Sequence, residues 1–118
     1  TQDIICLLSV AAPLVVLASL YEKADAYPHS RQCGSVTWVH RSLDGNTTAN
    51  GETWSSQQMV AAAKDRRLMG HTITVTANGR SVQVRVNDYS PNSRLDLSAA
   101  AFRRLAPLSR GIVNACWQ

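Results

Sequence analysis

TITVTANGRSVQVRVND, residues 72–88, is the stretch that most clearly predicts the fold. Apolar and polar residues alternate strictly on both sides of Asn78-Gly79, which is the strongest two-residue signal for a type I′ β-hairpin turn. Counting outward from that turn predicts two apolar pairs on one face of the hairpin, Val75 with Val82 and Ile73 with Val84. The stretch therefore predicts an antiparallel hairpin with one buried face.

Shorter apolar segments on either side of the hairpin predict further strands and a short helix. Residues 36–38 and 112–116 each suggest a strand, and within 94–107 Ser98 can cap a short helix. The stretch 56–67 is ambiguous, because its three successive alanines favour a helix whereas its short spacing suits a strand and a turn. Short strands, glycine-containing turns and one or two short helices together predict a mainly β protein with a closed barrel.

The N-terminal residues 1–26 resemble a secretory signal sequence. Residues 4–20 are almost continuously apolar, and Ala24-Asp25-Ala26 is a small-x-small pattern of the kind signal peptidase recognises. Asp3 stands where a complete signal carries Lys or Arg, so we expect the signal to be incomplete at its N-terminus. The alternative is a retained membrane anchor, but about 17 apolar residues interrupted by Pro13 are at the short limit for spanning.

We therefore expect cleavage before Tyr27 and no membrane span in the mature form. The expected organisation is a signal over 1–26, a short polar tail over 27–33 and one domain over 34–118. This predicts a secreted, periplasmic or cell-envelope protein, which we expect to be a monomer.

The charge balance points to an anionic partner. The whole chain carries a formal net charge of +4, and removal of residues 1–26 makes it more basic by two charges. Anionic polymers of a bacterial envelope fit this charge, and so does nucleic acid. An exported protein rarely meets nucleic acid, so cell-wall polysaccharide is the expected partner.

Two cysteines remain after the signal, Cys33 near the start of the domain and Cys116 near its end. In an oxidising compartment such a pair predicts a disulfide, whereas two free buried thiols are the alternative. Closing a loop of this length stabilises a small domain by roughly 4 kcal/mol in the chain-entropy model. There is no CxxC pair, and His29, His40 and His71 have no metal-ligand spacing, so we expect no metal and no cofactor.

Three carboxyl groups are candidates for chemistry. Asp88 follows Val86 by two residues at the end of the predicted strand. Alternate residues of a strand share a face, so the side chain of Asp88 is predicted to point toward the buried side, as that of Val86 does. A half-buried carboxyl suits a general acid, but accepting hydrogen bonds from turn amides is the more common role, and the pattern alone favours it. Asp96 precedes the predicted helix, and Glu52 follows a turn and is expected to be solvated.

Aromatic residues offer flat surfaces on which sugars can stack. Trp38, Trp54 and Tyr89 are the candidates, although core packing is the more common fate of a Trp in so small a domain. Asn46-Thr47-Thr48 is also an N-glycosylation sequon, which has meaning only in a eukaryotic source.

Five motifs occur in an order that resembles the rare lipoprotein A-like double-psi β-barrel family, which is related to expansin and barwin domains. The resemblance runs from about Gly34 to Trp117. The motifs are Val36-Thr37-Trp38, Thr48-Ala49-Asn50-Gly51-Glu52, Asn78-Gly79-Arg80-Ser81-Val82, Val84-Arg85-Val86-Asn87-Asp88 with Pro91, and Leu95-Asp96-Leu97-Ser98 followed by three alanines.

This resemblance implies a six-stranded double-psi β-barrel with a polysaccharide groove. Its members include lytic transglycosylases, in which an acid protonates the glycosidic oxygen and a hydroxyl of the sugar displaces the bond. Asp88 matches the family's catalytic Asp, which reverses the preference for a purely structural role, and Asp96 matches a second carboxyl. The substrate-binding residues expected from the resemblance are Trp38, Thr48, Asn50, Glu52 and Tyr89.

The chain departs from the family pattern beside this site. Lys64 stands where the family has a His that assists the catalytic Asp, and Tyr89-Ser90 replaces the usual Arg-Gly. A charged lysine beside Asp88 would favour the ionised carboxylate and weaken an acid catalyst. The resemblance also implies that residues 56–64 are extended. A peptidoglycan lytic transglycosylase is the first hypothesis. A non-catalytic expansin- or barwin-like module is the second, and a defence or effector protein the third.

Overall fold

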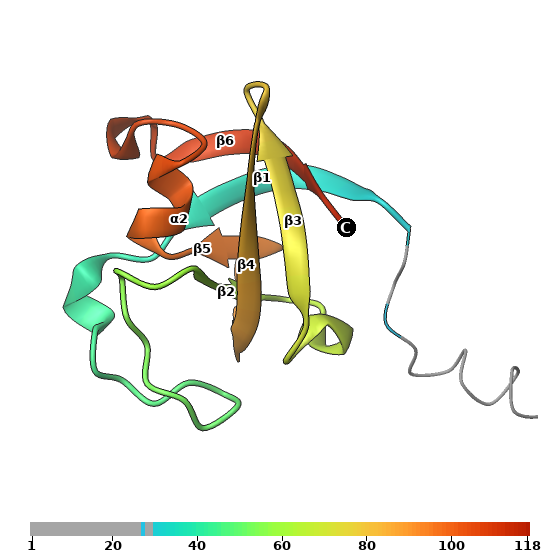
Figure 1. Cartoon of the computed structure of the whole chain (residues 1–118). Coiled ribbons are helices and arrows are strands. Elements are labelled where there is room, and N and C mark those ends of the chain that lie inside the picture. The colour runs from blue at the N-terminus through green and yellow to red at the C-terminus, as the bar shows by residue number, and fades with distance from the viewer. Residues whose placement is uncertain (1–26, 28–29) are drawn as a thin grey trace, which may run out of the picture.

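The computed structural model describes Tyr27 and residues 30–118, so the predicted signal sequence over 1–26 lies outside the described residues. These described residues form six strands and one short α-helix (Figure 1). The strands are β1 (Gln32–Trp38), β2 (Val60–Ala63), β3 (Thr72–Ala77), β4 (Arg80–Tyr89), β5 (Leu95–Leu97) and β6 (Ile112–Trp117). The helical elements are α2 (Ala99–Arg103) and the 3-10 turns η1 (Arg41–Leu43), η2 (Arg66–Leu68) and η3 (Leu108–Arg110).

The strands close into a barrel in the order β1-β5-β2-β4-β3-β6. β1 pairs in parallel with β5, and β2 pairs in parallel with β4, while the other neighbours are antiparallel. The predicted fold class, a mainly β six-stranded double-psi barrel, is confirmed. The ambiguous stretch 56–67 contains β2 and η2 rather than an α-helix, as the family resemblance implied. In the described part of the chain, no helix is long and apolar enough to cross a membrane.

The central hairpin has the predicted register. Val75 pairs with Val82 and Ile73 with Val84, and all four side chains are buried. Asn78 and Gly79 both have positive φ, 54° and 70°, as a type I′ turn requires. The hairpin forms because its turn and its alternating pattern specify the same register.

Gly79→Ala should destabilise the protein by about 1 kcal/mol, because an L-residue resists positive φ. No atom lies within 4 Å of the position that its Cβ would take, so backbone strain is the expected cause. Urea unfolding measures the effect, and Gln83→Ala, at an exposed position of the same hairpin, is the control. Equal stability of the two variants would contradict the assignment of this turn.

The core fills the barrel and extends beneath α2. Phe102 of α2 and Trp117 of β6 are both almost fully buried, together with inward-facing valines, leucines and alanines of the six strands. Ser98 caps α2 by accepting a hydrogen bond from the amide of Ala101. The predicted disulfide between Cys33 and Cys116 is present and joins β1 to β6, where the two residues are register partners.

Candidate functional site

A β-bulge near the end of β4 determines where Asp88 lies. Ala61 pairs with Val86, but the next residue of β2, Ala62, pairs with Asp88, so Asn87 is an extra residue in β4. The extra residue reverses the alternation of side chains between the two faces of β4. The prediction that Asp88 lies on the same side as Val86 is therefore wrong. Val86 belongs to the barrel core, whereas Asp88 is half-buried and shares the face of Ala62.

The face that carries Ala62 lies outside the barrel interior. Ala62 packs with Trp54 and Val60 in a small apolar cluster separate from the main core. Ala62 is also the register partner of Asp96 on β5, so Asp88 and Asp96 lie on the two strands that flank β2. Because neighbouring strands are about 4.8 Å apart, the backbones of the two aspartates are about 10 Å apart.

Both carboxyl groups line one hollow, which we call the aspartate hollow. It encloses about 210 Å³. Its lining residues are Val39, Leu43, Asn46, Thr47, Trp54, Ala62, Asp88, Tyr89, Ser90, Pro91 and Asp96. The structure thus brings together the two aspartates that the sequence singled out, in a depression that also offers aromatic surface.

Hydrogen bonds hold Asp88 by one of its two oxygens. Oδ1 accepts from the backbone amides of Ala49 and Tyr89, both at 2.9 Å. Within the described residues Oδ2 makes no hydrogen bond, which leaves it available to a substrate. Asp88 can therefore accept hydrogen bonds from backbone amides through Oδ1 and still act as a general acid through Oδ2.

Asp96 is positioned by β1. The hydroxyl of Thr37 donates a short hydrogen bond to its Oδ1, and the same hydroxyl lies 3.2 Å from Oγ of Ser93. Thr37 is the register partner of Asp96 in the parallel pairing of β1 with β5. Sequence reasoning did not identify this role for Thr37, because the alternating pattern of a strand does not reveal which strand lies beside it.

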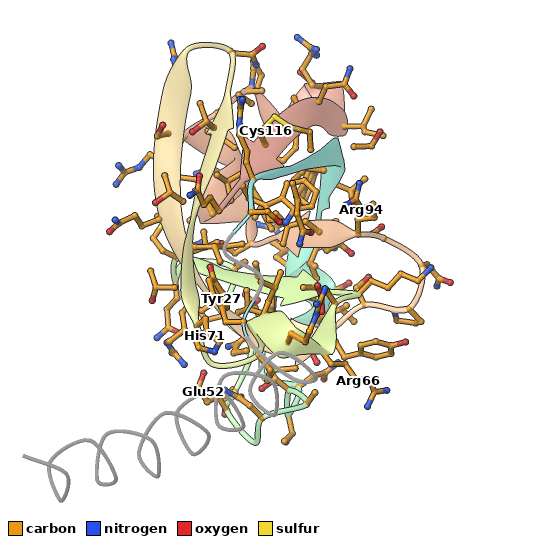
Figure 2. The ribbon with its side chains drawn as sticks, turned by 90° about the vertical axis from the view of Figure 1, so that its right-hand side faces the viewer. Tyr27, Glu52, Arg66, His71, Arg94 and Cys116 are labelled. Carbon is orange, nitrogen blue, oxygen red and sulfur yellow. A yellow bond between two sulfur atoms is a disulfide. The ribbon has the colours of Figure 1, made fainter. Side chains whose placement is uncertain are left out.

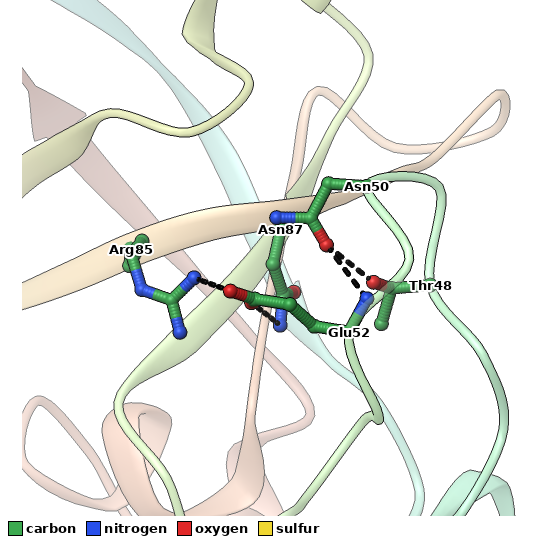
Figure 3. A network of polar contacts seen from close by, with 5 residues as sticks. All are labelled: Thr48, Asn50, Glu52, Arg85 and Asn87. Carbon is green, nitrogen blue, oxygen red and sulfur yellow. Dashed lines mark hydrogen bonds and ion pairs between the residues drawn. The ribbon is translucent and has the colours of Figure 1, made fainter.

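A polar network fixes the loop that precedes β2 against the bulge of β4 (Figure 3). Arg85 forms an ion pair with Oε2 of Glu52, and Nδ2 of Asn87 donates to its Oε1 at 3.2 Å. Oδ1 of Asn50 accepts from the hydroxyl of Thr48 at 2.7 Å and from the amide of Glu52 at 3.1 Å. Glu52 is partly exposed to solvent, as expected, and its carboxylate is in addition paired with Arg85 and Asn87.

This network changes the interpretation of three residues. Thr48, Asn50 and Glu52 were expected to bind substrate, but they are not among the residues that line the aspartate hollow. They hold the loop whose Ala49 amide binds Asp88, so they act on the hollow indirectly. The hydrogen bond from Arg85 lowers the pKa of Glu52 below its ordinary 4.5, and the bond from Asn87 acts in the same direction.

Glu52→Gln should loosen this loop, because an uncharged amide binds Arg85 more weakly than a carboxylate does. The stabilisation that the charge provides is complete above the ordinary pKa of 4.5 and is lost as the pH falls through the lowered value. The protection factors of the amides of Ala49 and Gly51, which are their exchange rates corrected for the intrinsic effect of pH, should therefore fall in acid in the wild type. In Glu52→Gln these protection factors should already be low at neutral pH, and unchanged protection there would contradict the assigned role.

The aromatic candidates separate into two groups. Trp54 and Tyr89 both line the aspartate hollow, and Trp54 is buried. The guanidinium of Arg66 lies over the ring of Tyr89, 4.2 Å from its centroid. Trp38 lies elsewhere, in a different hollow beside His40, and its indole Nε1 donates to the carbonyl of Leu108 at 3.0 Å. Trp38 therefore packs at the end of β1, away from the two aspartates.

Lys64 does not meet Asp88 in the aspartate hollow. Its side chain is exposed directly after β2 and lines another hollow together with Arg94 and Trp117. The residue at the position of the family's His thus lines a hollow other than the one that contains Asp88. Among Tyr27 and residues 30–118, no three His, Cys, Asp or Glu side chains gather in a way that could hold a metal ion.

Comparison with known proteins places the chain among double-psi barrels. A family described as lytic transglycolase matches residues 16–117. The endolytic peptidoglycan transglycosylase RlpA of Pseudomonas aeruginosa is 36% identical over 105 residues, which cover 86% of this chain and 31% of that protein. The chain therefore spans about a third of the length of this relative.

Further similarities extend to two other kinds of protein. The papain inhibitor of Streptomyces mobaraensis is 34% identical over 124 residues, covering 92% of this chain and 85% of the inhibitor. A solved structure of a Streptomyces papain inhibitor aligns with a TM-score of 0.64 at 29% identity, over 76% of this chain and 94% of that one. The free expansin of Clavibacter michiganensis aligns with a TM-score of 0.64 at 25% identity, over 75% of this chain and 50% of that one.

Proposed function

Because the chain belongs to the lytic transglycolase family of double-psi β-barrels, we propose that it cleaves the glycan strands of peptidoglycan as a lytic transglycosylase. The observation that carries the proposal is the placement of Asp88 and Asp96 on either side of Ala62, both lining one hollow. An enzyme of this kind acts in the bacterial envelope, which agrees with the predicted export of the chain.

In the proposed reaction Asp88 is the general acid. Its Oδ2 carries the proton and donates it to the glycosidic oxygen, while the amides of Ala49 and Tyr89 hold Oδ1 and stabilise the charge that forms. A hydroxyl of the same sugar attacks the anomeric carbon, the glycosidic bond breaks, and the proton of that hydroxyl passes to Asp96. The products are an anhydro-sugar end and a strand with a free hydroxyl, and no water is consumed.

Digestion of purified sacculi tests this function. Sacculi with and without stem peptides are incubated with the purified protein, and the released products are identified by mass spectrometry. Anhydro-muropeptides support a lytic transglycosylase. Sacculi that retain the protein in a pull-down but release nothing would instead mean a binding module and would overturn the catalytic proposal.

A second candidate, a non-catalytic binding module, is favoured by the position of Lys64. Among the described residues that line the aspartate hollow there is no His, and Lys64 lines a different hollow. Of the relatives described above, the papain inhibitor is covered over most of its length, whereas RlpA is covered over less than a third. Inhibition of papain by the same preparation, with no glycan cleavage, would select a protease-binding version of this candidate.

A further inference from the structure

A second hollow, which we call the basic hollow, lies beside the aspartate hollow and has no part in the chemistry above. It encloses about 310 Å³ and is lined by Gln32, Lys64, Asp65, Arg67, Arg94 and Trp117. Three cations and one carboxylate thus surround it. Figure 2 shows Arg94, which lines this hollow, on the right-hand side of the barrel.

The single carboxylate of the basic hollow does not neutralise Lys64 or Arg94. Asp65 is engaged by Arg67 through two parallel hydrogen bonds, Nε to Oδ1 at 3.0 Å and Nη2 to Oδ2 at 2.8 Å. Arg67 lowers the pKa of Asp65, and Asp65 in turn raises the pKa of Arg67. In the described part of the chain the side chain of Lys64 forms no hydrogen bond or ion pair, so its charge is available to a ligand.

Arg94 is held in place before any ligand arrives. Its Nη1 donates to the carbonyl of Cys33 at 2.6 Å, and its guanidinium carbon lies 5.2 Å from the centre of the Trp117 ring. Gly34 leaves room for this arrangement, because a Cβ there would come within 3.0 Å of Nη1. A guanidinium fixed in this way loses little freedom when it binds a planar anion.

The basic hollow begins where the strands of the aspartate hollow end. The amide of Lys64 donates to the carbonyl of Arg94 at 3.2 Å, which continues the β2–β5 pairing beyond its last register pair. Lys64 follows Ala62 by two residues, and Arg94 precedes Asp96 by two residues. A linear polymer lying over the two aspartates and along these strands would next reach the basic hollow.

We propose that the basic hollow is a subsite for a carboxylate group carried by an acidic polysaccharide, with Lys64 and Arg94 as its ligands. The inference rests on the proposed function, which supplies the class of polymer, namely a glycan strand. It adds that the protein prefers acidic glycans to neutral ones. A carboxylate matches the planar donor face of an arginine and accepts a charge-assisted hydrogen bond from a lysine.

Binding of trigalacturonic acid tests this subsite. Calorimetric titration with the trisaccharide should give about tenfold weaker binding for Lys64→Gln than for the wild type, the usual loss of one charge-assisted hydrogen bond. Galactotriose, which is neutral, should bind more weakly than the acid to the wild type and should not respond to the substitution. Arg80→Gln is the matched control, since it removes one exposed charge at the turn between β3 and β4, outside the basic hollow.

Three outcomes would overturn the inference. These are equal binding of the acidic and neutral sugars, equal loss in Arg80→Gln and Lys64→Gln, or tighter Lys64-dependent binding of polyglycerol phosphate than of the uronate. The last would assign the hollow to phosphate. None of these requires cleavage of sacculi to fail, so failure of the subsite and failure of the proposed function remain distinguishable.

Discussion

Replacing Asp88 with Asn is expected to slow glycan cleavage by about 10²–10⁴-fold, the usual contribution of a positioned general acid. An amide at this position can still accept the hydrogen bonds of Ala49 and Tyr89 through its remaining oxygen. What it cannot do is donate an acidic proton to the glycosidic oxygen. The variant should therefore retain its fold and its binding to sacculi while losing product formation.

The measurement is the initial rate of muropeptide release from sacculi, with the amount of bound protein determined in parallel. Asp44→Asn is a matched control, because Asp44 accepts two hydrogen bonds from Ser56 outside the aspartate hollow. Asp44→Asn should keep its activity under conditions in which it is folded. An Asp88→Asn rate within threefold of the wild type would remove Asp88 from the chemistry.

Replacing Cys33 and Cys116 together with Ser is expected to lower the free energy of unfolding by about 4 kcal/mol. The bond closes a loop with a sequence separation of 83 residues, so its loss releases a large amount of chain entropy in the unfolded state. It also joins the first and last strands at a register pair, where the pairing of β1 with β6 closes the barrel.

Urea unfolding of the double variant and of the wild type, with and without reductant, measures this effect. Reductant should bring the wild type to the stability of the double variant and leave the variant unchanged. A loss below about 1 kcal/mol in the double variant would contradict a stabilising role for this disulfide.

The central hairpin could be predicted to the residue because two local signals agree. The Asn78-Gly79 turn sets the register, and the alternation of valines and isoleucine sets the buried face. The capping of α2 by Ser98 is local in the same sense. Each of these features depends on residues close together in the chain, so the sequence carries them directly.

The bulge at Asn87 could not be predicted in this way. Counting by twos assumes an uninterrupted strand, whereas the extra residue is stabilised by contacts with a distant loop. The carbonyl of Asn87 accepts from the amide of Asn50, and its side chain donates to Glu52. The face on which Asp88 lies is therefore set by tertiary contacts rather than by the strand itself.

The same limit applies to Lys64 and Trp38. The family pattern places Lys64 beside the acid. The direction of a side chain just beyond the end of a strand depends, however, on the space between the neighbouring strands. Here the opening is lined by Arg94 and Trp117. The indole of Trp38 donates a hydrogen bond to the carbonyl of Leu108, seventy residues away in sequence, and no local pattern indicates this contact.

The most direct test of the central claim is digestion of sacculi in water enriched in oxygen-18. A lytic transglycosylase that uses the sugar's own hydroxyl should give anhydro-muropeptides free of the label from the wild type, and none from Asp88→Asn. Newly formed reducing ends in place of anhydro ends would show hydrolysis instead. Such ends, or no products from the wild type at all, would contradict the proposed reaction at Asp88 and Asp96.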